Sequence, residues 1–103
     1  MKSIKFLHTV LFWLKEPEKD ANNFENSLKK FIEDSKYVDL SFYGTSPKAE
    51  RDVVDDSFSF KLTVGFTSKE RHDAYQVEKA HIDFINEASP LWDKVLIYDG
   101  IRD

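Results

Sequence analysis

The chain has 103 residues, of which 41% are hydrophobic and 15% aromatic, which is enough for one small core in a single domain over residues 1–103. Its formal net charge is −4 and its lysines and arginines are scattered, so we expect neither a nucleic acid nor a membrane as a partner. Cysteine is absent, which excludes disulfides and a thiolate nucleophile.

The first residues share some features with a secretory leader but lack others. Lys2 and Lys5 precede an apolar run, yet this run contains His8 and leads into a charged segment, residues 15–20, without a small-residue cleavage site. No apolar run approaches the length of a membrane span. We therefore expect a cytoplasmic protein.

The segment 4–14 predicts a strand that is apolar on both faces. Alternate residues of a strand point to opposite faces. One face carries Ile4, Phe6, Val10, Phe12 and Leu14, and the other carries Leu7, Leu11 and Trp13. Such a strand needs a packed layer on each side. The chain offers only two helical segments, enough for one side, so we expect a second copy of the protein to cover the other.

The middle of the chain predicts a helix and two strands. The helix begins near Pro17 and runs to about Ser35, with apolar residues on one face at helical spacing. A strand from Val38 ends at Gly44, and residues 45–56 form a polar loop of unassigned role. Residues 58–66 alternate between bulky apolar and small or polar side chains, as a half-buried strand does.

The last third predicts a broken helix and a closing strand. Thr67 or Ser68 caps the helix, and its two apolar patterns are out of phase, which indicates a bend near Glu78 and Lys79. Residues 94–101 form the final strand. The order βαββαβ is typical of the ferredoxin-like α+β fold, a four-stranded antiparallel sheet with both helices on one face.

Four segments together resemble the stress-responsive A/B barrel (Dabb) family. They are residues 8–15 (HTVLFWLK), Tyr43-Gly44, Ala74-Tyr75 with His81 six residues after the tyrosine, and residues 91–99 (LWDKVLIYD). Their order and spacing cover essentially the whole chain. Membership implies a dimeric α+β barrel in which two sheets pack face to face, and it implies no single activity.

The resemblance also implies site residues. A plant member of the family closes a linear polyketide by aldol condensation without a cofactor, and its catalytic Tyr and His match Tyr75 and His81. A strand histidine near its pocket matches His8. Its substrate-contacting Tyr on the first helix falls at Leu28 here, so His8 and Leu28 are candidate ligand contacts. Many relatives carry Tyr-x-x-His-Pro-x-His where this chain has residues 75–81 (YQVEKAH), so the plant enzyme's substrate does not transfer.

Each candidate also fits an ordinary structural role. Tyr75 and His81 fit positions at the edge of a core, and His8 fits a hydrogen-bonded core or interface position. Glu78 and His81 have the spacing of a carboxylate-bridged metal helix, but such sites need a second copy of the motif. With His72 expected on the exposed first turns of its helix, the histidines are scattered, so we expect no metal and no cofactor.

We expect a homodimer that binds a small hydrophobic organic molecule in a pocket between sheet and helices. The alternative is a cofactor-independent lyase or cyclase. In that case His81 is general base and acid, Tyr75 donates a hydrogen bond to a carbonyl that gains negative charge, and His8 orients or neutralises from the sheet. A third class, the cofactor-free monooxygenases, shares the barrel architecture by analogy of fold alone.

Overall fold

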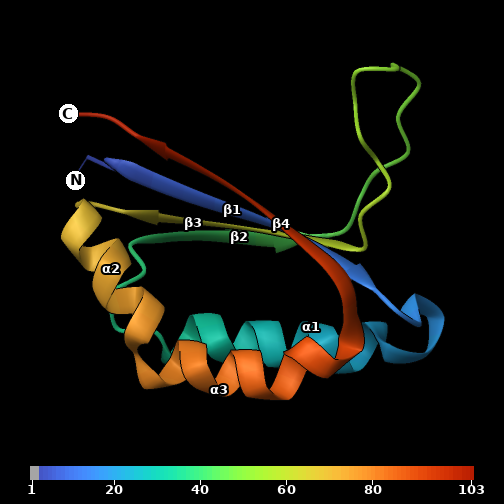
Figure 1. Ribbon diagram of the computed structural model, residues 1–103. Coiled ribbons are helices and arrows are strands. Elements are labelled where there is room, and N and C mark those ends of the chain that lie inside the picture. The colour runs from blue at the N-terminus through green and yellow to red at the C-terminus, as the bar shows by residue number, and fades with distance from the viewer. Residues whose placement is uncertain (1–2) are drawn as a thin grey trace.

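The structure, a computed structural model, describes residues 3–103 as an antiparallel sheet with helices on one side (Figure 1). Its elements are, in chain order, β1 (Phe6–Leu14), α1 (Pro17–Asp34), β2 (Leu40–Gly44), β3 (Phe60–Phe66), α2 (Lys69–Val77), α3 (Lys79–Ala88), the short 3-10 helix η1 (Ser89–Leu91) and β4 (Trp92–Ile101). The four strands lie in the order β2-β3-β1-β4. The ferredoxin-like arrangement predicted from the sequence is confirmed.

The observed strand bounds differ slightly from the predicted ones. The sequence predicts strand starts at Val38 and Phe58, whereas β2 begins at Leu40 and β3 at Phe60. Differences of this size are ordinary at the ends of elements, where the regular hydrogen bonding begins. No helix within residues 3–103 is both long enough and apolar enough to cross a membrane.

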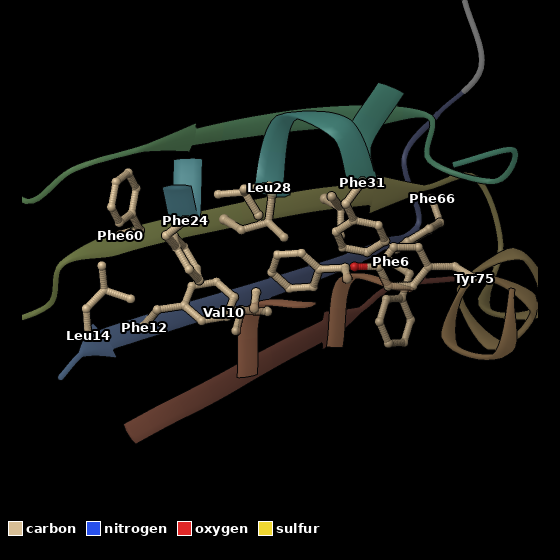
Figure 2. Close-up of a cluster of buried hydrophobic side chains, with 14 residues drawn as sticks. Phe6, Val10, Phe12, Leu14, Phe24, Leu28, Phe31, Phe60, Phe66 and Tyr75 are labelled. Carbon is tan, nitrogen blue, oxygen red and sulfur yellow. The ribbon is translucent and has the colours of Figure 1, made fainter. Parts of the chain in front are cut away.

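β1 is a central strand, and its side chains divide between two faces as the alternation predicts. Its even-numbered residues point toward the helices and are buried, whereas Leu7 is exposed on the other side. The register places Phe12 opposite Phe60 of β3 and Val95 of β4. The core lies between this face and the helices, and Figure 2 shows its aromatic cluster.

The helices present narrow apolar faces to this core. α1 buries Phe24, Leu28 and Phe31, which are spaced by one or two turns. Ser68 caps α2 by accepting a hydrogen bond from the backbone N–H of Arg71 at 3.2 Å. The predicted break is present, because the backbone of Glu78 is extended between α2 and α3.

The side chain of Glu78 fixes this break to the end of α1. Its carboxylate accepts hydrogen bonds from the Ser35 hydroxyl and from the backbone N–H of Lys36, the latter at 3.2 Å. α2 is held separately by Arg71, whose guanidinium contacts the Asp39 carboxylate at 2.9 Å. α2 is therefore held near its start by Arg71 and at its end by Glu78.

The other side of the sheet, which we call the open face, has no helix from residues 3–103 over it (Figure 1). The register brings apolar side chains from all strands but β3 to this face: Leu7, Leu11, Trp13, Leu40, Phe42, Leu96 and Tyr98. Phe42 and Tyr98 are 63% and 61% exposed. The connection between β2 and β3, residues 45–59, extends beyond the sheet and away from the helices (Figure 1).

Candidate functional site

A cavity of about 260 Å³ lies between the sheet and the helices. Most of its wall is apolar and includes Val10, Phe12, Phe31, Leu62, Phe84 and Trp92. Its polar groups are His8 from β1, Tyr75 and Gln76 from α2, and His81 from α3. Ile85 and Ile97, which are partly exposed, also line it and mark its side between α3 and β4. An apolar cavity with a few converging polar groups is typical of a small-molecule site.

The break at Glu78 brings Tyr75 and His81 together. In a continuous helix, residues six apart differ by about 600°, which leaves them about 240° apart around the axis. Here the two rings lie with their centroids 5.3 Å apart and their planes at 61°. Both pack on Phe31, at 5.4 Å and 5.5 Å. Figure 2 shows the Tyr75 ring reaching from α2 into the cluster under the sheet.

Burial favours the neutral forms of both groups. It raises the pKa of the Tyr75 hydroxyl, with smaller contributions from the charges of Glu78 and Asp99. Burial also lowers the pKa of His81. The charge of His8 lowers this pKa further, whereas the charge of Glu78 raises it. Among residues 3–103 no hydrogen bond occupies the Tyr75 hydroxyl or the His81 ring, whereas His8 and His72 are both bonded. A neutral phenol can donate to a ligand, and a neutral imidazole can accept a proton from it.

His8 reaches the cavity from β1 and is held by Asp99 of β4. The register places the two residues directly opposite, and the distance from His8 Nδ1 to Asp99 Oδ1 is 2.6 Å. Burial lowers the pKa of His8, although the hydrogen bond and the charge of Asp99 act in the opposite sense. Asp99 is a site residue that the sequence alone did not reveal. Only the pairing of the first and last strands brings it to His8.

His72 corrects an expectation. The sequence predicts it on exposed turns of the helix, but it is only 8% exposed. It stacks on Phe6 with ring centroids 4.1 Å apart, and its centroid lies 5.1 Å from that of His8. The reason is that His72 is three residues before Tyr75 and shares its face of α2, and this face packs on the sheet.

Leu28 lies elsewhere. It has no exposed surface, belongs to the core formed by α1, and is not among the residues that line the cavity. A ligand would reach Leu28 only if the core opened, so this contact stays a prediction.

The comparisons with known proteins identify the family. Residues 6–101 match the family described as the stress responsive A/B barrel domain (Dabb). The chain belongs to the Dabb family. No curated protein has a significant sequence match to this Dabb chain.

Solved structures share the fold of this Dabb chain at low identity. A Dabb family protein with a ferredoxin-like fold from Mesorhizobium loti has a TM-score of 0.78 at 19% identity and covers 98% of this chain and 99% of its own. A dimeric ferredoxin-like protein of unknown function from Thermobifida fusca has a TM-score of 0.75 at 12% identity, covering 97% and 92%. Hydroxynitrile lyase from Passiflora edulis has a TM-score of 0.74 at 14% identity, covering 98% and 96%.

Proposed function

We propose that the protein is a homodimer, each chain one domain over residues 1–103, that binds a small hydrophobic organic molecule in the cavity. The observation that carries this proposal is the apolar cavity into which Tyr75 and His81 both point with unoccupied polar groups. Apolar walls favour a flat or chain-like molecule, and the two polar groups would bind a carbonyl or hydroxyl oxygen on it.

The open face supports the dimer. Its apolar side chains include Leu40, Phe42 and Tyr98, each about half exposed or more, so a monomer would present a broad apolar surface to water. A second sheet packed on it would bury this surface and complete a barrel. The dimeric Thermobifida fusca protein of the same fold gives further support.

The second candidate function is a cofactor-independent lyase or cyclase, favoured by the pairing of Tyr75 with His81. In such a step the neutral His81 imidazole takes a proton from a carbon or hydroxyl of the substrate. Tyr75 donates a hydrogen bond to the carbonyl oxygen as it gains negative charge, and the protonated imidazole then returns its proton to the product. The Passiflora edulis enzyme of the same fold is named a lyase, which makes this class a reasonable one to test.

The test is binding of a panel of aromatic and alkyl carbonyl compounds, measured by the shift in melting temperature and then by calorimetry. Tyr75→Phe and His81→Leu each remove one hydrogen bond to the ligand, worth about 0.5–1.5 kcal/mol, so affinity should fall roughly two- to tenfold. Tyr37→Phe is the matched control, because Tyr37 stacks under Arg71 outside the cavity. Equal affinity in wild type and both site variants would refute the proposed site.

Incubation of the ligands that bind separates the two functions. Mass spectrometry or chromatography should show an unchanged compound if the protein only binds it. Conversion that stops in Tyr75→Phe and His81→Leu would favour the lyase or cyclase instead. Conversion that continues unchanged in both variants would exclude them as catalytic residues.

A further inference from the structure

Beside the cavity lies a cluster of three metal-ligand side chains, one of which, His8, also lines the cavity. His8 of β1, His72 of α2 and Asp99 of β4 each offer one ligand atom, and these atoms all lie within 4.8 Å of one another. The two imidazoles are buried and the Asp99 side chain is 41% exposed. We propose that this cluster binds one divalent transition-metal ion, with zinc the ion that fits best. The proposal is independent of the dimer and of the organic ligand.

The donor set selects the kind of ion. Two imidazole nitrogens and one carboxylate oxygen suit zinc and its first-row neighbours, whereas magnesium and calcium prefer sites made of oxygen alone. Zinc binds such atoms at about 2.0–2.2 Å in a tetrahedral arrangement, so two ligand atoms on one ion stand roughly 3.4 Å apart. The ligand atoms of this cluster lie within 4.8 Å of one another, so binding would draw the most distant pair together by up to about 1.4 Å. Asp99 is the ligand best able to close the difference, because it lies partly exposed on an edge strand.

Hydrogen bonds define the tautomer of His72. Its Nδ1 lies 3.2 Å from a carboxylate oxygen of Asp73, which only accepts, so Nδ1 carries the proton. Its Nε2 lies 3.1 Å from the Gln76 side-chain nitrogen, which donates, so the Nε2 lone pair now accepts this hydrogen bond and would bind an ion in place of Gln76. Both contacts indicate the same tautomer. A histidine whose second nitrogen donates to a carboxylate is the usual arrangement around bound zinc.

His8 and Asp99 now share a proton across 2.6 Å. An ion bound by both would take the place of that proton, as metal ligands must be deprotonated. Three protein ligands leave an open position on a four-coordinate ion. His8 lines the cavity and its ring centroid lies 5.9 Å from that of Tyr75, so the ion would lie beside the proposed ligand site.

The experiment titrates metal-free protein, prepared with a chelator, with zinc chloride in a calorimeter, and repeats the titration with magnesium chloride. We expect one zinc per chain and no saturable magnesium binding. His72→Gln and Asp99→Asn should each weaken zinc binding at least tenfold, because even the groups behind metal ligands contribute tenfold or more. Asp83→Asn is the matched control, because Asp83 is an exposed carboxylate outside the cluster, and it should bind zinc within about twofold of wild type.

Cobalt(II) gives a second readout, because its visible absorption reports direct coordination by nitrogen and oxygen ligands in a site of low symmetry. Wild type should develop this absorption at one equivalent, and Asp99→Asn should not. Circular dichroism checks the fold of each variant. If His72→Gln does not fold, Asp99→Asn decides the matter, because Asp99 lies partly in solvent. Absence of saturable zinc binding, or equal binding by wild type and Asp99→Asn, would overturn the proposal.

Discussion

Phe42→Glu should separate the proposed dimer while the monomer stays folded. Phe42 lies on the open face, 63% exposed and opposite Thr63 of β3, so in a monomer the change should alter the free energy of unfolding by about 0.5 kcal/mol or less. Between two packed sheets the new carboxylate would be buried without a partner, at a cost of about 3–5 kcal/mol. Two-fold symmetry places two such carboxylates in one interface, so the dissociation constant should rise by a factor of roughly 10⁴ or more.

Sedimentation over a concentration series measures this change against the chain mass of 12.1 kDa. Val77→Glu is the matched control, because Val77 is 73% exposed on α2, in the helical layer on the other side of the sheet, and receives the same charge. Its dimer should persist. A Phe42→Glu protein that sediments as a dimer like wild type would refute face-to-face packing, and a wild type that is monomeric at micromolar concentration would refute the dimer itself.

Three further substitutions test the local reasoning. Ser68→Ala removes the cap on α2 and should lower the free energy of unfolding in urea by about 1 kcal/mol, and a loss below a few tenths would contradict the role of that hydrogen bond. Phe31→Ala removes a ring stacked on Tyr75 and Phe84 and should cost about 3–5 kcal/mol in the same assay, so a loss under 1 kcal/mol would show that the ring is not packed. Burial lowers the pKa of His81, so its stabilisation is complete above the unfolded value of 6.5 and is lost as the pH falls through the lowered folded value. His81→Gln should therefore reduce the dependence of stability on pH below 6.5. Urea titrations at several pH values give the free energy of unfolding of both proteins, and an identical change of this free energy with pH in both would show that the reasoning is wrong.

The layers of the fold could be predicted because they depend on local alternation. Residues 4–14 are apolar on both faces, and β1 has a helix-facing buried side and an open side, as that pattern requires. The break at Glu78 was also visible, since two apolar patterns out of phase cannot share one straight helix. The first residues of β2 and β3 could not be predicted from the sequence, because hydrogen bonding at strand ends depends on the partner strand rather than on the residue itself.

The sequence indicates only part of the candidate site. The family motif points to Tyr75 and His81, and the break explains how they meet. Asp99 joins His8 only through the register between the first and last strands, which no local pattern specifies. The sequence does not predict the buried position of His72, because α2 has just nine residues, too few for its apolar face to stand out among so many charged neighbours.

The pairing of β1 with β4 also bears on how the protein is made. The two strands that lie farthest apart in the chain are neighbours in the sheet, so β1 leaves the ribosome long before its partner exists. Contacts of such long sequence separation carry a high loop-closure cost and slow folding. Until β4 is synthesised, β1 is an edge with unpaired backbone groups, and Val95 and Ile97 are missing from the cavity wall. The nascent chain is therefore most exposed to aggregation just before its last strand emerges, and a truncation that removes β4 would leave it in that state permanently.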